Sequence, residues 1–289
     1  MNSITLKAYA KINLGLDVLS KRADGYHDVC MIMQSINLYD TLTIKKSVER
    51  TISVETNLSY LPNNQKNLVY RAAELFLEAF PQNMGVKIDL KKRIPVAAGL
   101  AGGSSDAAAT LCGLNELFET GLSDEELMKL GVTLGADVPY CIMLGTALSE
   151  GIGELLTPIK PMPYCDILLV KPNISVSTKY VYDNLKLDST VPHPDILNMR
   201  QAIEESNLAG LTNCMDNILQ TVTIKDYPII TKIKEKMILH GAMTSLMSGS
   251  GPTVFGIFSD HRLAEKAFHY FKNTNFGKQV YLTRPYWPN

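Results

Sequence analysis

Residues 96–111, VAAGLAGGSSDAAATL, consist almost entirely of small side chains, with two adjacent serines in the middle. An apolar, helix-forming run follows the serines directly. Glycine in front of a helix lets the backbone approach an anion closely, and the unpaired N–H groups and positive dipole end of the helix attract that anion. Serine hydroxyls add further donors. The pattern predicts a phosphate-binding loop that leads into a helix from about Ser105 to Phe118.

The glycines alone leave a second interpretation open, because close packing of a helix also selects small side chains. The segment is not a Walker A loop, since no Lys-Ser or Lys-Thr pair follows its last glycine. It also departs from the G-x-G-x-x-G pattern, which disfavours a dinucleotide site.

Upstream of this loop, apolar and polar residues alternate from Ala10 to Leu19. A period of two is typical of a strand with one buried face, and it places Lys11 and Asn13 side by side on the other face. The tetrad DGYH at residues 24–27 indicates a turn. Further strands are expected at residues 31–38, 41–45 and 86–94, and a helix capped by Asn67 is expected to end before Pro81.

Downstream of the loop, Ser123 and Glu126 form a capping box for another helix, and Pro139 is expected to end it by biasing Val138 toward an extended conformation. The proline-rich stretch at residues 157–164 is the best candidate boundary, which divides the chain into domains at 1–158 and 159–289. The second half is expected to contain strands at 166–172 and 279–284, helices at 176–185, at 227–242 and from 260, and two strands around a Gly/Ser loop at 244–258. Mixed strands and helices in both halves predict the α+β class.

The composition excludes several classes of protein. The chain has 289 residues with 28 basic and 29 acidic side chains, so it lacks the charge excess typical of partners of nucleic acid or an anionic membrane. Five scattered cysteines without metal or redox spacing predict free buried thiols in a reducing compartment. The N-terminus lacks a signal-peptide pattern and no window is long and apolar enough to span a bilayer, so we expect a cytoplasmic protein.

Two further clusters could carry chemistry. The sequence SGSGP at residues 248–252 lies between two apolar strands, and it suits either an anion-binding loop or an ordinary hairpin turn. Lys11 is either an edge-strand lysine or a functional cation, and Asp137 is either an Asx-turn residue or a functional carboxylate. A carboxylate near a lysine and two phosphate loops would suit phosphoryl transfer to an alcohol.

Taken together, these motifs resemble the GHMP kinase superfamily, which includes galactokinase, homoserine kinase and mevalonate kinase. PVAAGLAGGSSDAAA at residues 95–109 is similar to the family's central glycine-rich signature, and SGSGP is similar to its C-terminal glycine motif. AKINLGLDV at 10–18, KRADGYHDV at 21–29 and LGADVPYCI at 134–142 resemble the members that act on 4-diphosphocytidyl-2-C-methyl-D-erythritol in the non-mevalonate isoprenoid pathway.

The resemblance implies a two-domain GHMP kinase fold, with an N-terminal domain like domain 2 of ribosomal protein S5 and a ferredoxin-like C-terminal domain. ATP and substrate would meet in the cleft between them, and the ATP γ-phosphoryl group would pass to the 2-hydroxyl of the substrate with the help of Mg²⁺. The enzyme would be a monomer or a homodimer without nucleic-acid or membrane partners.

The resemblance also implies roles for individual residues. Asp137 would accept or orient the hydroxyl proton, and Lys11 would position the hydroxyl and offset developing charge. The ATP phosphates would be wrapped by Pro95, Val96, Ala97, Ala98, Gly99, Leu100, Ala101, Gly102, Gly103, Ser104 and Ser105, with Asn67 and Lys92 near the adenosine. The substrate would be bound by Asn13, by Tyr26 stacked on the cytosine, by His27 at the edge of that base, and by Thr178, Tyr182, Gly249, Ser250 and Gly251.

The chain departs from the family pattern in the loop. Ala97, Ala98 and Ala101 stand where relatives often carry glycine, and we expect these alanines to keep negative φ angles. Asp106 places a carboxylate close to the phosphates, where it would favour the helix dipole, repel the nucleotide or approach the magnesium ion. No glutamate lies in a motif that assigns it to the metal, so the magnesium ligands stay open.

Two other functions compete with this one. A superfamily kinase for homoserine, mevalonate or a sugar would leave the Tyr26–His27 pair unexplained, because those substrates carry no base to stack upon. A non-catalytic nucleotide-binding sensor on the same fold would be expected to have lost Lys11, Asp137 or the serines, yet all are present.

Overall fold

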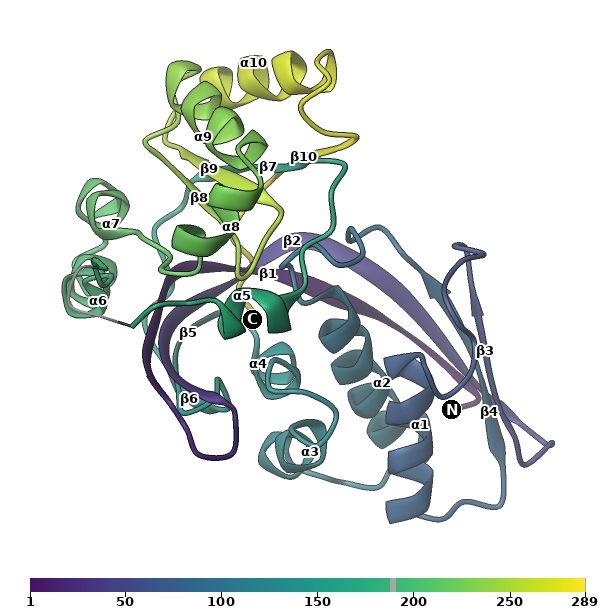
Figure 1. Ribbon diagram of the computed structural model, residues 1–289. Helices are drawn as coiled ribbons and strands as arrows, with labels where there is room; N and C mark the ends of the chain where they lie inside the picture. Colours follow the sequence, from purple (N-terminus) through teal and green to yellow (C-terminus); the bar gives the residue numbers. More distant parts are fainter. Residues whose placement is uncertain (188–190, 289) are drawn as a thin grey trace. The chain divides into compact units, whose positions relative to one another are not determined.

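The computed structural model describes residues 1–187 and 191–288 and divides into two compact units (Figure 1). The first unit comprises Met1–Ala10, Leu38–Val96 and Ala101–Leu144, and the second comprises Lys11–Asn37, Ala97–Leu100 and Gly145–Asn289. The long strands β1 (Ser3–Lys21) and β2 (His27–Ser47) contribute one end to each unit. Each unit is therefore assembled from segments that lie far apart in the sequence.

In the first unit, helices pack on a sheet. β4 (Gly85–Lys91) pairs antiparallel with the C-terminal end of β2 and parallel with β3 (Ile52–Thr56). α1 (Leu68–Ala79) lies beside α2 (Gly102–Phe118), which also packs against α4 (Val138–Met143), and α3 (Asp124–Gly131) contacts α4 (Figure 1). Gly113 allows α2 to come close to β1, because a Cβ there would lie 2.6 Å from Cδ1 of Leu6.

The second unit is built on a four-stranded antiparallel sheet in the order β10-β7-β9-β8. Its strands are β7 (Asp166–Lys171), β8 (Thr244–Met247), β9 (Val254–Phe258) and β10 (Gln279–Thr283). α9 (Ile229–Leu239) packs on β8 and β9, and α10 (His261–Lys272) packs on β7 and β10 (Figure 1). This strand order and the two helices give the ferredoxin-like arrangement that the family resemblance implies.

Further elements complete the second unit. The N-terminal end of β2 pairs with β5 (Thr146–Glu150), which pairs with β6 (Leu155–Pro158). Short helices α5 (Thr178–Asp183), α6 (Ile196–Glu204), α7 (Leu208–Cys214) and α8 (Gln220–Asp226) lie between β7 and α9 in the sequence. Of these four helices, the sequence patterns predicted only α5, within the helix expected at residues 176–185.

The local signals in the sequence are largely confirmed. The side chain of Asn67 caps α1, and Ser123 and Glu126 form both hydrogen bonds of the predicted capping box of α3. SGSGP joins the antiparallel strands β8 and β9. Among the described residues, the five cysteines form no disulfide; Cys141 and Cys165 are buried as expected, whereas Cys30, Cys112 and Cys214 are only half-buried. Within the described residues, no helix has the length and apolar character needed to cross a membrane.

Three expectations about elements are wrong. The two strands expected at 31–38 and 41–45 are one strand, β2. The strand at Ala10–Leu19 is buried on both faces from residue 10 to 18, and Met199 of α6 covers its polar face at Gly15. Val138 is helical, because Pro139 occupies the first turn of α4, where its missing N–H is not needed.

Candidate active site

The glycine-rich loop enters α2 through left-handed backbone conformations. Ala97, Gly99 and Ala101 have φ angles of 49°, 74° and 54°. The expectation that the alanines keep negative φ is therefore wrong for Ala97 and Ala101, each of which carries a strain of about 1–2 kcal/mol that glycine would avoid. Ala101 is the N-cap of α2 and makes no side-chain cap hydrogen bond. The first turn of α2 fits an anion, because its N–H groups are not capped by that side chain.

The two serines of the loop differ in their surroundings. Ser105 is 1% exposed, and its hydroxyl donates a hydrogen bond of 2.6 Å to the backbone carbonyl of Tyr9 on β1. Ser104 is half-buried, and the preceding Gly103 is exposed. Ser105 therefore fixes the first turn of α2 to the sheet, while Ser104 and Gly103 are the more accessible to a ligand.

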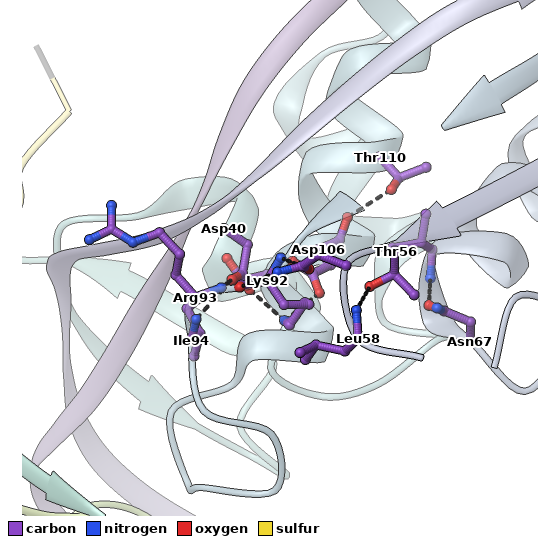
Figure 2. A network of polar contacts seen from close by, with 12 residues as sticks. Asp40, Thr56, Leu58, Asn67, Lys92, Arg93, Ile94, Asp106 and Thr110 are labelled. Atoms are coloured by element: carbon purple, nitrogen blue, oxygen red, sulfur yellow. Dashed lines mark hydrogen bonds and ion pairs between the residues drawn. The ribbon is translucent and has the colours of Figure 1, made fainter. Parts of the chain in front are cut away.

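Lys92 connects the strand before the loop to the helix after it. Its ammonium forms an ion pair of 2.6 Å with Asp106 on α2 and a second ion pair with Asp40 on β2, and all three side chains are buried (Figure 2). Asp40 also accepts hydrogen bonds from the backbone N–H groups of Arg93 and Ile94, the latter at 2.8 Å. The segment that leads into the glycine-rich loop is thus held by a buried carboxylate.

The charges of this cluster change one another's protonation. Burial alone would lower the pKa of Lys92, but the carboxylates of Asp106 and Asp40 outweigh it and raise the pKa above its ordinary value of 10.5. Burial raises the pKa of Asp106 well above its ordinary value of 3.8, and Lys92 only partly opposes this rise. Oδ1 of Asp106 is buried and has no hydrogen-bond partner among the described residues. Asp106 therefore contacts Lys92. The sequence left open whether Asp106 repels the nucleotide or approaches the magnesium ion, and its contacts among the described residues support neither role.

The residues predicted near the adenosine also have structural contacts. Oδ1 of Asn67 accepts from the N–H of Val69, and its amide donates to the carbonyl of Pro62. The backbone N–H and carbonyl of Lys92 are both bonded to the side-chain amide of Asn57, at 2.7 and 3.2 Å. A role of Asn67 and Lys92 toward adenosine stays a prediction.

In the second unit, the two glycine loops meet. The hydroxyl of Ser248 donates to the carbonyl of Gly99 at 2.9 Å, and a Cβ on Gly99 would lie 2.1 Å from the carbonyl oxygen of Ser248. The N–H of Lys11 on β1 donates to the carbonyl of Leu100 at 3.1 Å. The loop segment 97–100, the SGSGP loop and β1 therefore form one connected group.

Lys11 and Asn13 lie within this group. Lys11 is 5% exposed, and its ammonium donates to Oδ1 of Asn13 at 2.8 Å. Asn13 is fully buried, and a Cβ on Gly249 would lie 3.5 Å from its Oδ1. β1 pairs with β2 at the edge of the sheet, as an edge-strand lysine requires, but Lys11 is buried there. A buried lysine beside an amide oxygen and two glycine loops suits a negatively charged ligand.

The residues predicted to bind the base form two pairs in the second unit. The rings of His27 and Tyr182 lie 5.1 Å apart with an interplanar angle of 37°. The hydroxyls of Thr178 and Ser250 are hydrogen-bonded at 2.8 Å. Tyr26 is 59% exposed in the confirmed turn, where its N–H donates to the side chain of Asp24. Burial, followed by the charge of Lys21, lowers the pKa of His27 below 6.5, so its ring is neutral at neutral pH.

Asp137 belongs to the first unit and is the N-cap residue of α4. It makes no side-chain cap hydrogen bond with this helix. Lys11 belongs to the second unit. That Lys11 and Asp137 act together on one substrate therefore stays a prediction.

Sequence reasoning missed Asp40 and Asn57. An aspartate between the apolar residues of the strand-like segment NLYDTLTI was the available signal for Asp40, because a buried aspartate is almost always paired. Asn57 carried no such signal. Within the described residues, no group of three or more His, Cys, Asp or Glu side chains could hold a metal ion.

Comparison with known proteins agrees with this geometry. Residues 67–145 match the GHMP kinases N terminal domain, and residues 199–277 match the GHMP kinases C terminal domain. A 4-diphosphocytidyl-2-C-methyl-D-erythritol kinase of Lachnoclostridium phytofermentans is 58% identical over 98% of both chains, and one of Lachnospira eligens is 50% identical over the full length of both.

Solved structures extend this result. A crystal structure of 4-(cytidine 5'-diphospho)-2C-methyl-D-erythritol kinase superposes with a TM-score of 0.83 at 31% identity, over 99% of this chain and 100% of that one. A homoserine kinase from Cytophaga hutchinsonii shares the fold alone, with a TM-score of 0.80 at 19% identity over 98% and 95% of the two chains. The chain is an ATP-dependent kinase of the GHMP kinases, and it belongs to their family of 4-diphosphocytidyl-2-C-methyl-D-erythritol kinases.

Proposed function

We propose that this enzyme transfers the γ-phosphoryl group of ATP to the 2-hydroxyl of 4-diphosphocytidyl-2-C-methyl-D-erythritol, as a step of the non-mevalonate isoprenoid pathway. The observation that carries the proposal is the contact of buried Lys11 and Asn13 with both glycine loops, in a chain 58% identical to a kinase named for this substrate. The chain contributes binding and orientation, while ATP supplies the group that is transferred.

The phosphates of ATP are proposed to lie on the loop from Pro95 to Ser105. The support is the left-handed backbone at Ala97, Gly99 and Ala101, together with the N-terminus of the 17-residue helix α2. Asn67 and Lys92 are proposed to lie near the adenosine, because the chain segments that contain them resemble the family's segments at that position.

Lys11 and Asp137 are proposed to act on the accepting hydroxyl. The Lys11 ammonium stabilises the negative charge that develops during transfer, and Asn13 fixes the direction of that ammonium by accepting its hydrogen bond. Asp137 orients the hydroxyl and takes its proton late, because the transition state of phosphoryl transfer is generally loose. Positioning and charge neutralisation therefore contribute more than early proton removal.

The cytidine group is proposed to bind at Tyr26, His27, Thr178 and Tyr182. A flat ring surface and a neutral imidazole that both donates and accepts hydrogen bonds suit a pyrimidine. The contact of Thr178 with Ser250 connects this group to the SGSGP loop, which supports a substrate role for Gly249, Ser250 and Gly251.

The proposal also covers the binding of Mg²⁺, the domain boundary, the cellular location and the oligomeric state. Mg²⁺ is proposed to be held mainly by the nucleotide phosphates, since the described residues contain no cluster of three acidic, His or Cys ligands. We place the domain division between residues 158 and 159, and we propose a cytoplasmic monomer or homodimer.

A coupled assay for ADP release tests the proposal. The purified enzyme receives MgATP with 4-diphosphocytidyl-2-C-methyl-D-erythritol, homoserine, mevalonate or galactose in separate reactions. We expect turnover with the cytidylyl substrate alone, and competition by cytidine diphosphate. Turnover with another alcohol would overturn the substrate assignment, and nucleotide binding without any ADP release would favour a sensor.

A further inference from the structure

Asn217 is a buried amide to which the reaction assigns no role. It lies between α7 and α8 and is 1% exposed. Its Nδ2 donates to the carbonyls of Met247 and Gly249, at 2.7 and 2.8 Å, and its Oδ1 accepts from the N–H of Leu219 at 3.0 Å. Both amide hydrogens are therefore used on the two carbonyls that flank Ser248 in the chain.

The backbone around Asn217 is attached to β1. The N–H of Leu16 donates to the carbonyl of Asp216, and the N–H of Ile218 donates to the carbonyl of Leu16, both at 3.0 Å. These two bonds form an isolated parallel bridge between Leu16 and Asn217. Asn217 is consequently fixed to the strand that carries Lys11 and Asn13.

The carbonyls that Asn217 holds belong to the SGSGP loop at its closest approach to the other functional groups. Ser248 bonds to Gly99 of the first glycine loop at 2.9 Å, and Gly249 lies beside the side chain of Asn13. The loop has left-handed conformations at Gly249 and Gly251, with φ angles of 56° and 89°. Such a loop has many alternative conformations, so its position depends on the side chains that bind its carbonyls.

We propose that Asn217 is a positioning residue of the kinase, which holds the SGSGP loop in register with Lys11 and Asn13 on β1. The side-chain amide binds the loop, and the backbone of residues 216–218 binds the strand, so a single residue fixes their separation. The catalytic consequence rests on the proposed function, because it assumes that Gly249, Ser250 and Gly251 contact the substrate. The structural consequence, an ordered loop, does not.

The variant Asn217→Asp separates positioning from packing. Aspartate has nearly the same shape, but its carboxylate cannot donate to the carbonyls of Met247 and Gly249. We expect hydrogen exchange at the amides of Ser248 and Gly251, which are hydrogen-bonded within the loop, to accelerate by about tenfold or more. Exchange in α9 is expected to stay unchanged. The KM for the cytidylyl substrate should rise and kcat should fall by about tenfold, with the KM for ATP changing by less than about twofold.

Asn207→Asp is the matched control, because the Asn207 side-chain oxygen caps α7 and an aspartate keeps that role. If Asn217→Asp does not fold, Asn217→Ser retains one donor and is expected to show a smaller acceleration in the same amides. Unchanged exchange at Ser248 and Gly251 would overturn the proposal, and so would an acceleration spread evenly over α9 and the loop. A loosened loop in an enzyme that does not accept the cytidylyl substrate would refute the proposed function and leave the clamp by Asn217 in place.

Discussion

The hydroxyl of Ser248 donates a hydrogen bond of 2.9 Å to the carbonyl oxygen of Gly99, and this bond joins two glycine loops that are about 150 residues apart in the sequence. Neither loop is distinctive alone, since glycines also serve turns and helix packing. The two loops contact each other next to Lys11 and Asn13, which disfavours a role in turns or helix packing alone. This contact accounts for the glycine at 99, because a side chain there would collide with the carbonyl of Ser248 in the second loop.

Gly99→Ala tests this contact. The new Cβ would lie 2.1 Å from the carbonyl oxygen of Ser248, at a residue with φ of 74°, so the loops must separate. We predict that kcat/KM for ATP falls by about tenfold or more, with a clear loss of thermal stability. Gly121→Ala is the control, because its φ of 71° imposes similar backbone strain while nothing lies within 4 Å of the added Cβ. Equal effects of the two variants would show that strain, and not the contact, explains the glycine.

Lys92→Met tests the buried ion pairs that flank the loop. Removing the ammonium leaves Asp40 and Asp106 buried without a counter-charge, which is predicted to cost about 3–5 kcal/mol in the free energy of unfolding. Lys91→Met is the neighbouring control, because Lys91 pairs with Asp89 on the surface and its loss should cost no more than about 1 kcal/mol. Chemical denaturation of both variants measures the difference.

The pH dependence of stability provides a second measure of Lys92. Its pKa is raised above 10.5 in the folded protein, so its stabilising contribution is complete below that value and is lost as the pH rises through the raised pKa. The unfolding free energy of the wild type should therefore decline in this alkaline range by more than that of Lys92→Met. Parallel curves for the two proteins would contradict the assigned ion pairs.

His27 is predicted to make substrate binding sensitive to acid. Burial and Lys21 lower its pKa, against Asp183, so the folded enzyme keeps a neutral imidazole down to a pH below 6.5. As the pH falls through this lowered pKa, the ring gains a charge, and both the binding of the base and the stability contributed by His27 are lost. We expect the KM for the cytidylyl substrate to rise over this range while the KM for ATP stays flat. In His27→Gln the KM for the cytidylyl substrate should be high at all pH values and lose this dependence.

Asp137→Asn tests the role of the carboxylate. A residue that orients the hydroxyl and accepts its proton should contribute a factor of about ten or more to kcat, equivalent to about 1.4 kcal/mol of barrier. Substrate KM values are expected to change little, because asparagine preserves the shape. A loss of kcat well below tenfold in steady-state kinetics would remove Asp137 from the catalytic residues.

Local chemistry explains which parts of the fold were predictable. Caps such as Asn67 and Ser123 act on their own helix, so short patterns identified them. The strained alanines were not predictable, because the left-handed φ of Ala97 and Ala101 is maintained by the surrounding fold and not by their own preference. The burial of both faces of β1 was hidden for a similar reason, since Met199, which covers Gly15, lies about 180 residues further along the chain.

In the site, too, local motifs were predictable and contacts between distant segments were not. The motifs identified Lys11, Asn13 and both glycine loops, whose arrangement in the second unit depends on strand pairing and hairpin formation. Asp40 and Asn217 carry no motif of their own, because their importance lies in the backbone groups they bind, which only the folded chain brings near.

The position of the new phosphate on the product directly tests whether the enzyme phosphorylates the 2-hydroxyl with the help of Lys11. The enzyme would be incubated with MgATP and 4-diphosphocytidyl-2-C-methyl-D-erythritol, and the product examined by ³¹P NMR, with Lys11→Met as the inactive control and Lys7→Met, an exposed lysine on the same strand, as the matched active one. Because carbon 2 bears a methyl group and no hydrogen, a phosphate on its hydroxyl shows no coupling to a proton on the adjacent carbon. We expect one such uncoupled phosphomonoester signal from the wild type and Lys7→Met, and none from Lys11→Met. A phosphomonoester split by neighbouring protons, or free phosphate alone, would contradict this expectation.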